Sequence, residues 1–258
     1  MKKAFIYLFV FIAIQMIGGG VIGGIWQLAS GSTDTTMGQL ITATSVVGVI
    51  TIAVFLLKRW TEVSPTWLRT RPWLVLTWSV IAALGALIPS AWLQEQMPEL
   101  PNVMENEFDM IMNTRWGYVA IGLLAPLSEE IVFRGAILKS LLGSQRLPVW
   151  GAIAISALLF ALIHFNPAQM PHAFLIGLLL GWMYWRTGSI LPGMAYHWVN
   201  NSAAYVLYAF YPDPDMKLID LFKGSQQHVY MSLAFSLLIL LPALYQLHLW
   251  MRRADERR

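Results

Sequence analysis

Charged residues in this chain fall between long stretches that contain no Asp, Glu, Lys or Arg. These stretches run from Ala4 to Thr33, Thr35 to Leu57, Pro72 to Gln94, Leu147 to Trp185, Thr187 to Pro212 and Gly224 to Met251. A helix needs roughly 20 apolar residues to cross the hydrocarbon core of a bilayer. The stretch that begins at Leu147 is long enough for two passes, and Asn166-Pro167 and Pro171 mark a turn inside it. A further segment, from about Trp116 to Leu142, is apolar apart from a few charged residues.

The pattern therefore predicts an all-α, polytopic membrane protein with about eight transmembrane helices in a single transmembrane domain, 1–258. The predicted spans lie near 4–25, 38–57, 73–93, 115–142, 149–165, 171–185, 190–210 and 228–250. The first apolar run is longer than a typical signal-peptide core and has no A-x-A site, so we expect it to remain as the first helix. The acidic segment from Glu95 to Asp109 contains Pro98 and Pro101 and is predicted to be an irregular loop.

The basic residues predict the orientation, because cytoplasmic loops of membrane proteins are enriched in Lys and Arg. With both termini inside, the inner segments carry Lys2, Lys3, Lys58, Arg59, Arg69, Arg71, Lys139, Arg146, Arg186, Arg252, Arg253, Arg257 and Arg258. The outer segments carry Asp34, Glu95, Glu99, Glu105, Glu107, Asp109, Asp213, Asp215 and Asp220, with Arg115, Lys217 and Lys223 as their basic residues. We therefore expect an N-in, C-in protein of a plasma membrane, the inner membrane if the source is a bacterium.

Composition agrees with a membrane protein and excludes other classes. Apolar residues make up 57% of the chain and charged residues 12%, whereas a soluble domain has about 25% charged residues. The net charge of +3 follows from the inner loops, so it implies no nucleic-acid partner. The chain has no cysteine, which removes disulfides, thiolate nucleophiles and cysteine metal sites.

Ionisable side chains inside the predicted spans are the candidates for chemistry, because a charge within a bilayer is costly. In the fourth span, Glu130 and Arg134 are one helical turn apart and can form a buried ion pair. Glu129 is then a second carboxylate with no cation of its own nearby in the sequence. Adjacent buried carboxylates disfavour each other's charged form, and such a group can serve as a general base.

Two other spans add imidazoles and an amide. His164 closes the fifth span, while His197 and Asn201 lie one turn apart in the seventh. Each could simply make hydrogen bonds between helices. Together with the carboxylates, they form a set suited to activating water and stabilising an oxyanion. Straight helices would place His164 about 22 Å and His197 about 10 Å from the inner ends of their spans, so one site requires tilt or stagger.

These motifs resemble those of a known family. Glu129-Glu130-x-x-x-Arg134, Phe160-x-x-x-His164 and His197-x-x-x-Asn201 look like the three ordered motifs of the CAAX-processing and bacteriocin-processing (CPBP, or "Abi") intramembrane proteases. The flanking sequences Ala125-Pro126-Leu127-Ser128 and Arg186-Thr187-Gly188-Ser189 match as well. The resemblance covers about Trp116 to Ser202, within a motif-bearing core of about 115–210.

The resemblance implies an eight-span membrane endopeptidase that acts on a membrane-associated, prenylated or peptide substrate. By residue-by-residue transfer, Glu129 would activate water with help from His164, and Glu130 and Arg134 would complete the first motif. His197 and Asn201 would hold the oxyanion or the geometry of the site. The resemblance also suggests a site that opens to the cytoplasm.

Metal dependence and function class leave alternatives open. The family is often described as metalloproteases, and Glu129, His164 and His197 could form a three-ligand zinc site. The chain has no His-Glu-x-x-His motif, so a metal-free site is favoured and zinc stays possible as the cofactor. A non-catalytic membrane scaffold or bacteriocin self-immunity protein is the alternative function, and a transporter lacks the support of an internal repeat. The expected partners are the lipid bilayer and a peptide or protein substrate, while the oligomeric state is not predicted.

Overall fold

The structure is a computed structural model that describes residues 1–62, 72–144, 146–213 and 216–251. Some charged residues used in the predicted orientation lie outside the described residues, namely Arg69, Arg71, Asp215, Arg252, Arg253, Arg257 and Arg258. The described chain is helical and contains no strand, which confirms the predicted all-α class.

Helices occupy all eight segments predicted to span the membrane. The first segment is α1 (Lys2–Ala13), η1 (Ile14–Gly18) and α2 (Gly19–Ser30), followed by α3 (Met37–Leu57) and α5 (Trp73–Glu95). The motif segment is continuous and comprises α7 (Arg115–Gly117), η2 (Tyr118–Leu124), α8 (Ala125–Glu129), η3 (Glu130–Leu138) and α9 (Lys139–Leu142), where η marks π-helix. The remaining long helices are α10 (Val149–Leu162), α11 (Met170–Thr187), α12 (Leu191–Phe210) and α14 (Gln226–Trp250).

Two short helices lie in the predicted outer loops. They are α6 (Glu105–Met112) and α13 (Leu218–Leu221). The prediction of an irregular acidic loop up to Asp109 was therefore wrong in its second half, because Pro98 and Pro101 precede α6 and do not interrupt it. Glu105 and Glu107 in the first turn of α6 favour the helix, since carboxylates are stabilised near a helix N-terminus.

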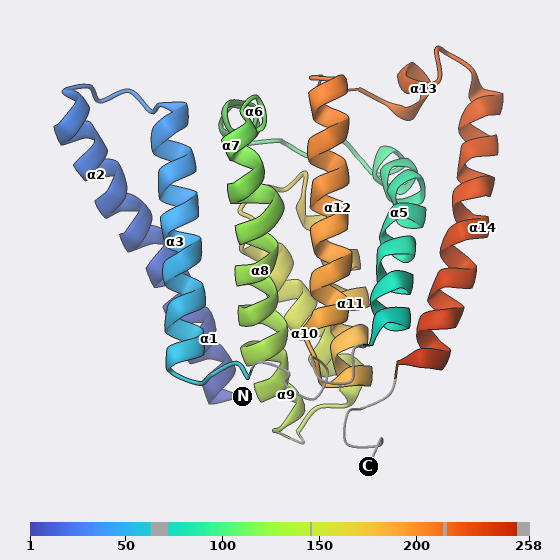
Figure 1. The fold of residues 1–258 in the computed structure, drawn as a ribbon, viewed down its shortest axis with the longest axis horizontal. Coiled ribbons are helices and arrows are strands. Elements are labelled where there is room, and N and C mark those ends of the chain that lie inside the picture. Colours follow the sequence, from blue (N-terminus) through green and yellow to red (C-terminus); the bar gives the residue numbers. More distant parts are fainter. Residues whose placement is uncertain (63–71, 145, 214–215, 252–258) are drawn as a thin grey trace.

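Four helices among the described residues are long and apolar enough to cross a membrane: Lys2–Ser30, Met37–Leu57, Trp73–Glu95 and Gln226–Trp250. They support an integral membrane protein. The eight-span count and the orientation remain predictions. In Figure 1 the N-terminus and the end of α14 lie at the same end of the molecule, while α6 and α13 lie at the opposite end. We call these the N-terminal end and the α6 end.

The motif segment forms the centre of the bundle. α8 contacts α3 and α12, and η3 packs against α1, α10 and α11 (Figure 1). All nine residues of η3 are buried. Phe133 is in edge contact with Phe11 of α1 and Phe160 of α10, with ring centroids 5.6 and 5.3 Å apart. The first helix therefore covers the motif segment on the side away from α12.

Side chains of neighbouring segments satisfy backbone groups of the π-helix. The hydroxyl of Thr61 donates to the carbonyl of Ile131 at 2.6 Å, and that of Ser156 donates to the carbonyl of Phe133 at 3.1 Å. Gly135 permits the approach of Thr61, because a Cβ at this position would lie 2.2 Å from the Thr61 methyl group. π-helical turns are rare and are found frequently at functional sites.

The acidic segment is fixed to the turn between α10 and α11. The buried Asn166 side chain accepts from the backbone N–H of Val103 at 3.2 Å and donates to the Asn102 side chain at 2.8 Å. The N–H of Ala168 donates to the carbonyl of Pro101 at 3.3 Å. Residues 101–103 are thereby held over the end of α10, next to His164.

Candidate functional site

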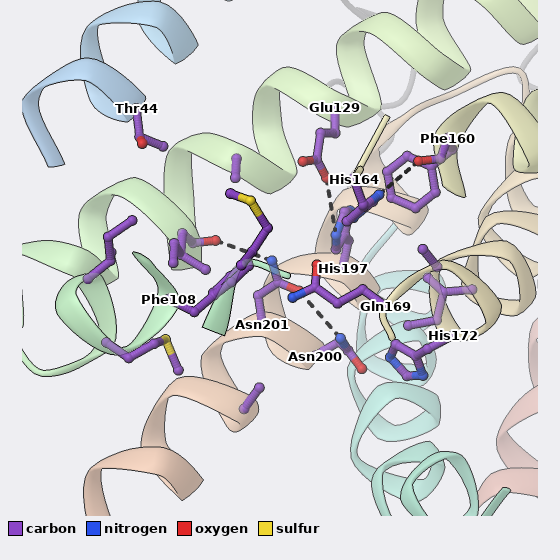
Figure 2. Close-up of a pocket in the computed structure, with 18 of the residues that line it drawn as sticks. Thr44, Phe108, Glu129, Phe160, His164, Gln169, His172, His197, Asn200 and Asn201 are labelled. Carbon is purple, nitrogen blue, oxygen red and sulfur yellow. Dashed lines mark hydrogen bonds and ion pairs between the residues drawn. The ribbon is translucent and has the colours of Figure 1, made fainter. Parts of the chain in front are cut away.

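The structure gathers the six predicted residues around one cavity of about 500 Å³. Glu129, His164, His197 and Asn201 line this cavity. Glu130 and Arg134 do not line it, because they lie behind His197 in the interior, with their side chains at most 1% exposed. Figure 2 shows the lining side chains converging from the motif segment, the α10–α11 region and α12.

Glu130 and Arg134 form the ion pair expected from their spacing. Nη1 of Arg134 donates to Oε1 of Glu130 at 2.8 Å. Its Nη2 also donates to the carbonyl of Gly177 at 3.4 Å, and the guanidinium lies 4.4 Å from the ring centre of Phe160. The carboxylate, the carbonyl and the aromatic face together offset the desolvation cost of burying the charged guanidinium of Arg134.

His197 lies between the two adjacent carboxylates. Its Nδ1 is 3.2 Å from Oε1 of Glu130, and its Nε2 is 3.6 Å from Oε2 of Glu129. A carboxylate can only accept, so Nδ1 carries the proton in this contact. Nε2 is then turned toward Glu129, which is the partly exposed carboxylate of the two, with 17% of its side chain accessible.

Gly193 makes room for the Glu130 carboxylate. It lies one turn before His197 on α12, and a Cβ built on it would be 2.9 Å from Oε2 of Glu130. This oxygen has no hydrogen-bond partner among the described residues. The close approach of α12 to η3 at Gly193 is thus what lets Glu130 reach His197.

The imidazoles of His164 and His197 lie close enough together to contact the same aromatic ring, that of Phe160. Its ring is in edge contact with His164 at 5.0 Å and with His197 at 5.8 Å between centroids. α10 has only 14 residues and ends at Leu162, so His164 stands in the turn that follows it. Nδ1 of His164 donates to the carbonyl of Phe160 at 2.8 Å, which leaves Nε2 as the free nitrogen. No hydrogen bond or ion pair joins His164 to Glu129 among the described residues.

Asn201 is held by hydrogen bonds at both ends of its amide. Its Nδ2 donates to the carbonyl of Ile121 in η2 at 3.2 Å, and its Oδ1 accepts from Nδ2 of Asn200 at 3.3 Å. Each amide nitrogen has two N–H groups, so both asparagines retain one for a bound carbonyl oxygen. Asn200, one residue before the motif position, therefore takes part in the cavity as well.

Among the polar residues of the cavity wall that the motifs did not predict are His172 and Gln169. They lie at the beginning of α11 and face the cavity beside Asn200 in Figure 2. His172 makes no hydrogen bond through its side chain that involves another described residue. The sequence could have indicated His172 through its position in the charge-free stretch from Leu147 to Trp185, because an ionisable ring in an apolar membrane helix usually has a polar partner or a functional role.

The arrangement does not fit the zinc alternative. Among the described residues, no group of three or more His, Cys, Asp or Glu side chains could hold a metal ion. A metalloprotease-like site built from Glu129, His164 and His197 is therefore not supported.

Comparison with known protein families supports the resemblance found in the sequence. The family model described as type II CAAX prenyl endopeptidase Rce1-like matches residues 111–203. This stretch contains all six motif positions and almost all of the cavity wall contributed by η2, α8 and α12. No curated protein and no solved structure matches the chain. The family that this model describes is one of proteases, which are hydrolases.

Proposed function

Because the match over residues 111–203 supports membership of the CPBP/CAAX protease family, we propose that this chain is an intramembrane endopeptidase that uses a Glu129-activated water. The chain acts as an integral protein of a plasma membrane, the inner membrane in a bacterium. Its substrate is a peptide, or a membrane-associated or prenylated protein.

The observation that carries the proposal is the different surroundings of the two adjacent glutamates. Glu130 is fully buried and is engaged by Arg134 and His197. Glu129 forms no ion pair with a Lys or Arg among the described residues, and it faces the cavity beside Nε2 of His197. One carboxylate thus has a positioning role, and the other is free to take a proton.

The reaction follows from these positions. Glu129 takes a proton from a water molecule while the water oxygen bonds to the scissile carbonyl carbon. The resulting oxyanion receives hydrogen bonds from the free amide N–H groups of Asn200 and Asn201. The proton on Glu129 then passes to the amide nitrogen as the C–N bond breaks, which releases an amine and a carboxylic acid, and the acid gives up its own proton to water or to the amine.

The two histidines assist from fixed orientations. Glu130 holds the Nδ1–H tautomer of His197, so Nε2 points at Glu129 and the water beside it. The Phe160 carbonyl fixes His164 with its Nε2 free. The remainder of the wall is mostly apolar, including Phe108, Ile111 and Ile176. Such a wall fits an apolar peptide segment, and the polar groups would fix the position of the segment relative to Glu129.

Purified protein assayed on a library of quenched fluorescent peptides, with prenylated CAAX peptides included, tests the proposal. We expect Glu129→Gln to reduce hydrolysis by about 10²–10⁴-fold, the usual contribution of a general base. Glu107→Gln is the matched control, because Glu107 is a second carboxylate on the cavity wall with no imidazole contact among the described residues. Full activity of Glu129→Gln would refute the proposed base. Peptide binding without hydrolysis by the wild-type protein would favour the scaffold or immunity alternative.

A further inference from the structure

The cavity extends from Glu129 toward the α6 end of the molecule. Its wall includes Met104, Glu107, Phe108 and Met112 from α6 and the residue before it, together with Gln94 near the end of α5. Gln94 is exposed and forms part of the rim. Figure 1 shows α6 and the end of α5 at the α6 end, opposite the N-terminus. The mouth of the cavity is therefore at this end.

The other side of the site is closed by packed side chains. No residue of η3, which directly follows Glu129, or of α9, which follows η3, lines the cavity. Val132, Phe133, Ile137 and Leu138 are all 0% exposed and separate the site from the N-terminal end. Glu130 and Arg134 fill the space behind His197. Among the described residues, the structure offers no path for a peptide from the N-terminal end.

The two ends of the molecule also differ in the sign of their charged residues. The described basic residues at the N-terminal end include Lys2, Lys3, Lys58, Arg59, Lys139, Arg146 and Arg186. The α6 end carries acidic residues, among them Asp34, Glu95, Glu99, Glu105, Glu107, Asp109 and Asp220. Because Lys and Arg mark the cytoplasmic side, the charges predict that the N-terminal end is cytoplasmic and that the cavity mouth is on the outer side.

The family resemblance suggests a cytoplasmic opening, whereas the loop charges predict a cytoplasmic N-terminus. In this chain the two cannot both hold, because the mouth and the N-terminus lie at opposite ends. The charge pattern carries more weight, since it is a property of this sequence over all of its loops.

We propose that the site is reached from the extracytoplasmic side, so that its substrates are exported or outer-leaflet-anchored polypeptides cleaved near the outer membrane surface. The substrate class rests on the proposed protease function, but the direction of access does not. The acidic segment, fixed by Asn166 onto the α10–α11 turn, then forms the outer rim that a substrate crosses to reach Glu129.

The absence of cysteine allows a direct test with single-cysteine variants and a membrane-impermeant thiol reagent. Ala204→Cys and Gln94→Cys place thiols on the wall and the rim of the cavity. Glu99→Cys is the control at the α6 end, and Glu62→Cys is the control at the N-terminal end, where Glu62 pairs with Lys139. Both control side chains are well exposed, at 97% and 77%.

In intact spheroplasts we expect Ala204→Cys, Gln94→Cys and Glu99→Cys to react, and Glu62→Cys to react only after permeabilisation. Reaction of Ala204→Cys only from the cytoplasmic side, together with Glu62→Cys, would overturn the proposal. Failure of Ala204→Cys to react from either side would also overturn it, because an open outer mouth requires access.

The labelling pattern does not depend on catalysis, so it should be the same in a Glu129→Gln background. This separates failure of the proposed access from failure of the protease function. Where hydrolysis is measurable, modification of Ala204→Cys from outside should lower its rate at least tenfold relative to the same unmodified variant. Modification of Asp34→Cys, an exposed position of the α6 end that does not line the cavity, should leave the rate unchanged.

Discussion

Glu130 and His197, 67 residues apart in the chain, are joined by a hydrogen bond of 3.2 Å from the imidazole Nδ1 to the carboxylate Oε1. The same oxygen accepts from Arg134 at 2.8 Å. One buried carboxylate therefore links the motif segment to α12, compensates the arginine and fixes the imidazole that faces Glu129. The arrangement gives each of the two adjacent glutamates a separate task.

Replacing Glu130 by glutamine should destabilise the protein as well as inactivate it. The change leaves the buried Arg134 without its counterion, and breaking a buried pair costs about 3–5 kcal/mol. Thermal unfolding in detergent should show a clear fall in Tm. Glu62→Gln, which removes an exposed pair with Lys139, should change stability by only about 0–1 kcal/mol. Equal Tm values for the two variants would contradict a structural role for the Glu130–Arg134 pair.

Gly193→Ala tests the positioning of His197 without changing any charged group. The new methyl group would lie 2.9 Å from Oε2 of Glu130, whose other oxygen is already held by Arg134 and His197. We expect the carboxylate to move and the imidazole to lose its alignment, so kcat should fall about tenfold or more with little change in KM. Such a pattern reflects lost transition-state stabilisation.

Gly20→Ala provides the control for a helical glycine. A Cβ at Gly20 meets nothing within 4 Å, so this substitution should leave kcat unchanged and can stabilise the helix by about 0.4–1 kcal/mol. If Gly193→Ala behaved like Gly20→Ala in a kinetic assay, the contact between Gly193 and Glu130 would have no functional consequence.

The helices and the six motif positions could be predicted because their signals are local. A charge or an imidazole in an apolar stretch is visible without knowledge of the fold, and an i, i+4 spacing fixes a common helix face. Glu130 and Arg134 pair as that spacing requires. The helix around them follows from length and hydrophobicity alone.

The features that could not be predicted depend on how helices are rotated and tilted against each other. The Glu130–His197 bond joins different helices, and no local pattern marks it. His172 has no i, i+4 polar partner of its own and enters the site through the placement of α11. The cavity mouth at the α6 end likewise depends on Asn166, which holds a distant loop through bonds that spacing does not reveal.

Asn166→Ala should loosen the outer rim of the cavity. The side chain is 0% exposed and bonds both Val103 and Asn102, and loss of a partner for a buried polar group costs about 1–3 kcal/mol. Hydrogen exchange should accelerate at the Val103 amide while α5 and α12 keep their protection. Asn113→Ala, which removes an exposed side chain, is the control. Unchanged exchange at Val103 would show that the loop is held by other contacts.

Removal of metal should leave hydrolysis intact. A zinc ion needs ligand atoms that converge, but among the described residues no group of three or more His, Cys, Asp or Glu side chains could hold a metal ion. Nε2 of His197 faces Glu129 at 3.6 Å, a geometry suited to a shared water in a Glu129-base mechanism. We therefore expect the same rate before and after prolonged dialysis against a strong chelator, and no gain on adding zinc. Glu129→Gln in the same preparation sets the background rate.

Activity that disappears with the chelator and returns only with zinc would mean that Glu129, His164 and His197 rearrange into a ligand set. The chain would still be a protease, but with a metal-activated water in place of the one that Glu129 deprotonates alone.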